Sequence, residues 1–148
     1  MDLFLAKIYL LFSFILGVVI GPSYIQVEAE NLSFNFNTGG NYPIIRYLNV
    51  KNIGTQKVRF DISSNVSWAD VFKEGDAGAH SVELSEQVAV NFVLQINAQY
   101  AKDGVSNAEI VLNAVSLISQ AQTVLDTKKI NVVLNKNPEP IPITIAFT

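Results

Sequence analysis

The chain has 148 residues, of which 49% are hydrophobic and 16% charged, a composition that suits one domain with one core. Its net charge of -3 provides no basic surface for phosphate groups, so we do not expect a nucleic-acid partner. The absence of cysteine excludes disulfides and thiolate metal sites, and packing alone must therefore stabilise the fold.

The first 29 residues predict export. Lys7 precedes the apolar run 8–20, a Gly-Pro break follows, and Ala29 is a small residue typical of a cleavage site. We therefore expect a signal peptide over residues 1–29 and a secreted or cell-surface protein. The alternative is an uncleaved membrane anchor, because the apolar character continues to Val27 and approaches the roughly 20 residues that span a bilayer.

The next segments show the two-residue period of half-buried strands. Residues 32–36 alternate apolar and polar side chains, and 44–50 and 58–63 continue the pattern. Between the last two, we expect a tight turn at residues 52–55, in which Gly54 supplies a positive φ. The first half of the chain thus predicts three strands before the lone tryptophan.

The second half repeats this period more strongly. Residues 88–96 predict a central strand, and the segments 110–114 and 130–134 predict two more, the first of them after an Asp-Gly turn. Residues 117–125 fit either a short helical crossover or a long hairpin end. The row expected to face inward in the central strand is Val88, Val90, Phe92, Leu94 and Ile96.

Many short strands without a sustained amphipathic helix predict an all-β fold, an antiparallel two-sheet immunoglobulin-like sandwich over residues 30–136. The residues on the apolar phase of each strand should share one core. The residues expected in this core are Phe60, Ile62, Val90, Phe92, Leu94, Leu112 and Val132.

Few residues suggest chemistry. Trp68 is expected to be a core anchor rather than a ligand platform. His80, the only histidine, follows a loop with Glu74 and Asp76, but this set lacks the ligand spacing of a calcium loop and a second nitrogen or sulfur ligand. No nucleophile elbow or phosphate loop is present. We therefore expect no metal, no cofactor and no enzymatic activity.

Asn31 and Asn65 each begin an Asn-x-Ser sequence, so both are candidate N-glycosylation sites in an exported protein.

Residues 137–148 predict a proline-rich linker followed by an edge or donor strand. Prolines occupy even positions, and because alternate residues direct their N-H groups to opposite edges of a strand, only one edge loses donors. The segment is an edge strand, the start of another domain, or a strand exchanged with a neighbouring subunit. The apolar residues of this candidate exchange segment are Ile141, Ile143, Ile145 and Phe147.

Several short motifs resemble bacterial and archaeal immunoglobulin-like modules of the BACON and related types. The motifs are Asn-x-Gly-Thr at 52–55, Phe-Asp-Ile-Ser-Ser at 60–64, Ser-Trp at 67–68, the strand at 88–96, and Asp-Gly before Glu-Ile-Val-Leu at 109–112. The resemblance spans about residues 31–135. It implies a β-sandwich that is a non-catalytic part of a secreted or surface protein.

The layout of the chain is also similar to that of prokaryotic surface-filament subunits, which complete each other's sheets by exchanging a strand. We expect a structural or adhesive role, with other surface proteins or further copies of the chain as partners. The alternatives are a filament subunit assembled by strand exchange and a glycan-binding or enzyme accessory module. Membrane contact is expected only through the N-terminal segment, if it is uncleaved.

Overall fold

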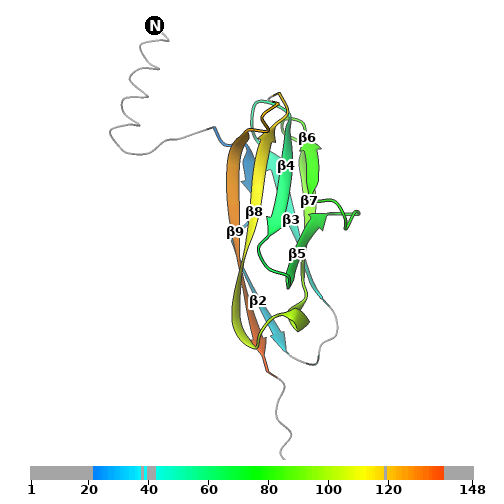
Figure 1. Cartoon of the computed structure of the whole chain (residues 1–148), viewed down its shortest axis with the longest axis vertical. Helices are drawn as coiled ribbons and strands as arrows, with labels where there is room; N and C mark the ends of the chain where they lie inside the picture. Colours follow the sequence, from blue (N-terminus) through cyan, green and yellow to red (C-terminus); the bar gives the residue numbers. More distant parts are fainter. Residues whose placement is uncertain (1–21, 38, 40–42, 119, 139–148) are drawn as a thin grey trace, which may run out of the picture.

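Two sheets lie face to face in the computed structural model, which describes residues 22–37, 39, 43–118 and 120–138 (Figure 1). Its described residues include one short 3-10 turn, Ala98–Tyr100, and no helix long and apolar enough to cross a membrane. The strands are β1 (Ile25–Val27), β2 (Asn31–Asn37), β3 (Ile44–Asn52), β4 (Val58–Ser64), β5 (Ala69–Lys73), β6 (Ser81–Leu84), β7 (Ala89–Ile96), β8 (Gly104–Ser116) and β9 (Val124–Asn137).

Sheet 1 has the strand order β1-β3-β7-β5, and sheet 2 has the order β2-β9-β8-β4-β6. The order of sheet 1 matches the A-B-E-D arrangement of an immunoglobulin sandwich, and the strands β9-β8-β4 of sheet 2 match its G-F-C arrangement, so the predicted fold class is confirmed. One pairing departs from the expected antiparallel pattern, because β2 runs parallel to β9. The cause is a change of sheet: the chain leaves sheet 1 after β1 and enters sheet 2 as β2.

The sandwich begins before residue 30, the boundary that the sequence suggested. Tyr24 and Ile25 are buried, and β1 pairs with the end of β3. Asp126 fixes this start of the fold, since its Oδ2 atom accepts hydrogen bonds from the backbone N-H groups of Tyr24 (2.8 Å) and Ile25 (3.1 Å). The apolar character that continues to Val27 therefore has a structural cause within the domain, and cleavage after Ala29 would remove a strand.

Gly54 is required for a different reason from the expected one. Its φ is not positive, unlike that of Gly39, Gly75 and Gly104. Instead the ring of Tyr24 lies directly against it, and a Cβ atom at position 54 would collide with that ring. The glycine of the Asn-x-Gly-Thr motif thus makes room for the first buried residue of the domain.

We expect Gly54→Ala to lower the free energy of unfolding by about 1–3 kcal/mol, because overpacking forces buried neighbours to move. The measurement is urea denaturation of the full chain. The same substitution made together with Tyr24→Ala should cost less than it does alone, since the smaller side chain removes the collision. Equal costs in the two backgrounds would contradict this contact.

The asparagine of the same motif is a buried hydrogen-bonding centre. The Nδ2 atom of Asn52 donates to the carbonyl oxygens of Gln56 and Leu84, both at 2.9 Å, and its Oδ1 atom accepts from the N-H of Gly54 at 2.9 Å. Its own N-H donates to the carbonyl of Val88 at 3.0 Å. This fully buried side chain thereby joins the turn after β3 to β6, and the backbone of the same residue pairs with Val88 just before β7.

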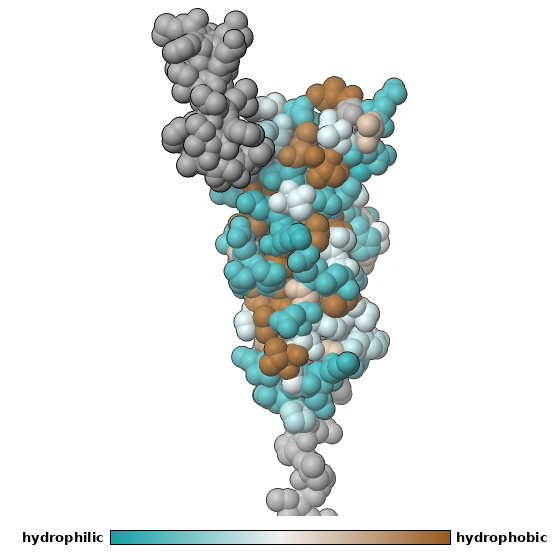
Figure 2. All heavy atoms as spheres, turned by 60° about the vertical axis from the view of Figure 1, so that its left-hand side comes forward, coloured by the Kyte–Doolittle hydropathy of each residue, from teal (hydrophilic) through white to brown (hydrophobic). Residues whose placement is uncertain are grey.

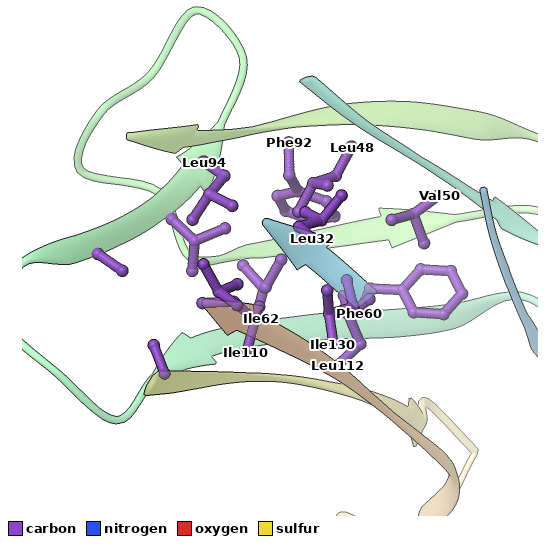
Figure 3. Packing of buried hydrophobic residues seen from close by; sticks show 14 of the residues in the cluster. Leu32, Leu48, Val50, Phe60, Ile62, Phe92, Leu94, Ile110, Leu112 and Ile130 are labelled. Carbon is purple, nitrogen blue, oxygen red and sulfur yellow. The ribbon is translucent and has the colours of Figure 1, made fainter. Parts of the chain in front are cut away.

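The core lies between the two sheets, where apolar side chains from both meet (Figure 3). All seven residues expected in the core belong to it, Val90 at its partly buried margin, so this prediction is confirmed. Val88 is the exception among the expected inward row, because it precedes β7 and is 44% exposed. The fully buried large side chains include Phe60, Phe92, Leu94, Ile96, Ile110, Leu112, Ile130 and Leu134.

Residues 117, 118 and 120–125 belong to a hairpin end, which decides between the two alternatives that the sequence allowed. The strands β8 and β9 pair from Gly104↔Lys136 to Val115↔Val124, with a bulge at Ala114/Val115. Both strands are longer than the alternating apolar segments that predicted them, because polar residues occupy the ends of the strands. This hairpin forms one end of the molecule (Figure 1).

A charged group on the outward face of sheet 2 is held by its neighbours. Arg59 donates to Asp61 through Nε (2.8 Å) and Nη2 (3.0 Å), and the hydroxyl of Ser81 donates to Asp61 at 2.8 Å. Burial alone would raise the pKa of the Asp61 carboxyl, but the hydrogen bonds from Arg59 and Ser81 and the charge of Arg59 outweigh it and lower the pKa.

A carboxyl group whose folded pKa is lowered stabilises the fold above its unfolded pKa, about 3.9, and loses that contribution as the pH falls through the folded value. We therefore expect the stability difference between the wild type and Asp61→Asn to shrink as the pH falls from 5 towards 2. Urea melts across this range measure it. A difference that stays constant with pH would show that Asp61 does not contribute through its charge.

Candidate protein-binding face

Apolar side chains lie on the outward face of sheet 1, which the sequence pattern did not lead us to expect. Ile45 and Tyr47 come from β3, Val93 from β7 and Phe72 from β5; we name these four residues the Tyr47 patch. The strand register places Tyr47 and Phe72 on either side of Val93 in one row across the sheet. Tyr47 is 54% exposed and Ile45 is 44% exposed, whereas Val93 between its neighbours is buried.

The phase of β3 explains why these side chains point outward. Leu48 and Val50 face the core, so the odd-numbered residues of the same strand face away from it. Neighbouring side chains in such a cross-strand row have Cβ atoms about 4.5–5.5 Å apart, close enough to contact. The patch is therefore built on three paired strands and not on a loop.

Hydrogen-bonded polar side chains border the Tyr47 patch. Asn49 donates from Nδ2 to Oδ1 of Asn91 at 2.9 Å, and Asn91 donates in turn to Oε2 of Glu74 at 3.1 Å. On the other side, Gln95 donates to Oδ1 of Asn97 at 3.1 Å. An apolar centre with an ordered polar rim is the arrangement found in protein interfaces.

The sequence did contain a signal for this face. In β3 and β7 the even-numbered residues already supply the core, yet Ile45, Tyr47 and Val93 occupy odd positions. Strands that are apolar on both faces mark either a buried sheet or an exposed apolar surface. Because the inward phase alone accounts for a core strand, it did not predict the outward one.

Trp68 lies where the sequence predicted. Its side chain is buried and belongs to the core, and its carbonyl oxygen accepts a hydrogen bond from the N-H of Asn97 at 2.7 Å. This residue fixes the entry to β5 and offers no exposed ring to a ligand.

His80, Glu74 and Asp76 are not brought together around one point. The Nδ1 atom of His80 lies 2.8 Å from the carbonyl oxygen of Val71, Glu74 accepts from Asn91, and Asp76 accepts from the N-H of Gly78 at 3.2 Å. Within the described part of the chain, no group of three histidine or carboxylate side chains is placed to hold a metal ion. These three residues serve the loop between β5 and β6.

An open hollow of 530 Å³ lies between β4 and the outer edge of β5. Side chains already occupy the hydrogen-bonding groups at the middle of that edge: the N-H of Val71 donates to Oδ1 of Asp70 at 2.9 Å, and His80 lies on its carbonyl. A protected edge does not favour the addition of another strand. The hollow has a mixed lining, made of the polar residues Ser63, Ser64, Ser67, Asp70, His80 and Asn97 and the apolar residues Ile62, Val66, Ala69 and Val71.

Both candidate glycosylation sites are exposed. Asn31 opens β2 and accepts a hydrogen bond from Nδ2 of Asn131 at 3.3 Å, whereas Oδ1 of Asn65 accepts from the N-H of Glu109 at 2.8 Å. Exposure is a requirement for modification, and glycosylation itself stays a prediction. The candidate exchange segment with Ile141, Ile143, Ile145 and Phe147 lies outside the described residues.

No protein-family model matches the sequence, and a search of curated proteins finds no relative. Solved structures do resemble it. A PapD-like domain of human CEP192 matches with a TM-score of 0.58 and 13% identity, covering 84% of this chain and 92% of that domain. The YadV chaperone matches with a TM-score of 0.56 and 9% identity, covering 78% of this chain, which spans about half (53%) of the chaperone.

A chain from the Salmonella enterica complex of the SafA pilin with the SafB chaperone matches with a TM-score of 0.55 and 11% identity, covering 80% of this chain and 57% of that one. Identities this low show the fold alone. The protein is therefore an all-β sandwich of the immunoglobulin-like kind, with structural neighbours among PapD-like domains and pilus chaperones.

Proposed function

We propose that the protein is an exported, non-enzymatic immunoglobulin-like module with a structural or adhesive role, and that it binds another protein through the Tyr47 patch. The observation that carries this proposal is the row of apolar side chains on the outward face of sheet 1, with Tyr47 54% exposed at its end. Monomeric soluble proteins rarely expose contiguous apolar surface without a use for it.

The composition of the patch favours a protein partner. Tyrosine combines a large apolar ring with a polar tip and loses little conformational entropy on binding, which is why it is frequent among residues that dominate binding energies. The strands beneath the patch hold its backbone in place, so little ordering cost is expected on association. The likeness to BACON-type modules and the likeness to pilus chaperones both support a non-enzymatic role of this kind.

Export is part of the same proposal, because the sequence before the domain carries the apolar run 8–20. The buried position of Tyr24 restricts how that segment is processed: cleavage has to occur before residue 24, or not at all, if β1 is to remain. N-terminal sequencing of the exported protein distinguishes these outcomes, and a mature chain that starts at Glu30 would contradict the restriction.

The binding role is tested by placing a photo-crosslinking amino acid at position 47 in the full chain, with position 127 as the control. Thr127 is exposed on the outward face of the other sheet. We expect a discrete adduct from position 47 that is absent from position 127, with the mass of a second protein or of a second copy. Equal labelling from both positions would contradict a specific face, and binding of soluble glycans that depends on Tyr47 would instead support the accessory-module alternative.

A second candidate function, a filament subunit assembled by strand exchange, is favoured by one observation. The strand β2 is one of the two edge strands of sheet 2, and Phe34 and Phe36 on it are only partly buried. A donated strand with one apolar face, such as residues 141–147, could pair with such an edge. If so, deletion of residues 139–148 should abolish concentration-dependent oligomers; unchanged oligomers would exclude this role for the tail.

A further inference from the structure

The turn between β8 and β9 presents apolar side chains to solvent. We name residues 116–118 and 120–124 the hairpin tip. Ile118 is 78% exposed, Leu117 before it is also exposed, and Val124, the first residue of β9, is 52% exposed. A hydrogen bond from the N-H of Ser116 to the carbonyl of Thr123, at 2.9 Å, closes the hairpin just below these residues. Figure 2 shows apolar residues at the upper end of the sandwich, where this hairpin ends.

The hairpin tip carries no charge. Between Glu109 and Asp126 the sequence contains no Asp, Glu, Lys or Arg. Turns in water-soluble domains are usually rich in polar residues, because they run over the surface. An uncharged tip with exposed aliphatic side chains can enter an apolar environment without the cost of removing a charge from water. Its chemistry therefore fits a lipid surface better than a charged protein surface.

The described chain starts beside this tip. Asp126 accepts hydrogen bonds from the backbone N-H groups of Tyr24 and Ile25, and Asp126 lies only two residues after Val124. Ile53 adds a further connection at this end, since its N-H donates to the carbonyl of Tyr24 at 3.0 Å. The chain that precedes the domain consequently joins it at the end that carries the hairpin tip.

The preceding residues have the composition of a membrane-spanning segment. Residues 3–20 contain a single charged residue, Lys7, and their length lies within the roughly 17–25 residues of a spanning helix. Only three residues, 21–23, separate this stretch from Tyr24, and three residues extend over at most roughly 10–11 Å. A domain on so short a tether is held close to the bilayer.

We propose that the hairpin tip is a membrane-contact surface: residues 1–21 are retained as an anchor, and Leu117, Ile118 and Val124 enter the interfacial region of the same bilayer. The sandwich then stands with this end on the membrane, while the Tyr47 patch faces sideways along the membrane surface. The inference uses the export of the chain, but it does not depend on what the Tyr47 patch binds.

The absence of cysteine allows a clean test in the full chain. Ile118→Cys and, as the matched control, Val105→Cys are each labelled with an environment-sensitive fluorophore after reconstitution into phosphatidylcholine vesicles. Val105 is 67% exposed and lies at the opposite end of β8. We expect the label at position 118 to show blue-shifted emission and quenching by lipids that carry a quencher near the headgroup, and the label at position 105 to show neither.

In the phosphatidylcholine vesicles, two results would overturn the proposal. One is a label at position 118 that stays in a water-like environment, like the one at position 105. The other is a full chain that does not float with the vesicles, because no anchor then holds the tip to a membrane. Since the tip is uncharged, the shift at position 118 should also persist when anionic lipid is added; a shift that requires anionic lipid would show electrostatic adsorption instead. None of these readouts involves Tyr47, so they stand apart from the test of the binding face.

Discussion

A chain that begins at residue 30 is expected to be far less stable than one that begins at residue 22. The shorter chain lacks β1 and the buried side chains of Tyr24 and Ile25, and it leaves the ring-shaped space over Gly54 empty. Burial of two such side chains stabilises a fold by about 3–6 kcal/mol, which is comparable with the whole stability of many domains. Urea or thermal melts followed by circular dichroism measure the difference.

The chain that begins at residue 22 is the control, because it retains every residue that the structure describes. Its unfolding midpoint should equal that of the full chain, which is measured in detergent. If the two truncated chains unfold at the same urea concentration, β1 does not contribute to stability. Cleavage after Ala29 would then be compatible with a stable fold.

Phe92→Ala is expected to lower the free energy of unfolding by about 3–5 kcal/mol. Phe92 is fully buried in β7, at the centre of sheet 1, between Leu48 of β3 and Lys73 of β5 in the strand register. Its removal leaves a cavity that paired strands on both sides cannot easily fill.

Val88→Ala provides the matched control for that substitution. Val88 was expected in the same inward row, but it precedes the strand and is 44% exposed. Exposed substitutions usually change stability by less than about 0.5 kcal/mol. If Phe92→Ala lowers the free energy of unfolding by less than about 1 kcal/mol, or if both variants lower it by similar amounts, the assignment of β7 as a central strand that contributes Phe92 to the core is wrong.

The alternation of apolar and polar residues predicted much of the fold. It identified the strands that carry Phe60, Phe92 and Leu112, because a period of two leaves only one face for the core. It did not identify β1, since three residues show no period, and their apolar character merged with the export segment before them. It also assigned the wrong reason to Gly54, because close approach of a distant ring, that of Tyr24, cannot be read from local turn chemistry.

The candidate site was harder to predict than the fold. Tyr47 and Val93 lie in different strands, and only the register of β3 with β7 brings them side by side. The parallel pairing of β2 with β9 was missed for the same reason, because pairing direction depends on which sheet the chain enters. His80 was a candidate ligand because it is the lone histidine, yet in the structure its ring lies against the backbone carbonyl of Val71 at the edge of β5.

The central claim is tested most directly by measuring affinities for the partner, that is, for the protein that crosslinks to position 47. Its affinity is compared for the purified wild-type chain, for Tyr47→Ala and, as the control, for Thr127→Ala. If the crosslinked protein is a second copy, the same comparison is made with the dissociation constant of the dimer. We predict that Tyr47→Ala weakens binding by about 2 kcal/mol or more, roughly 30-fold, as expected for a central tyrosine of an interface. Thr127→Ala should leave the affinity unchanged. Equal affinities for all three chains would contradict the assignment of the Tyr47 patch as a protein-binding face.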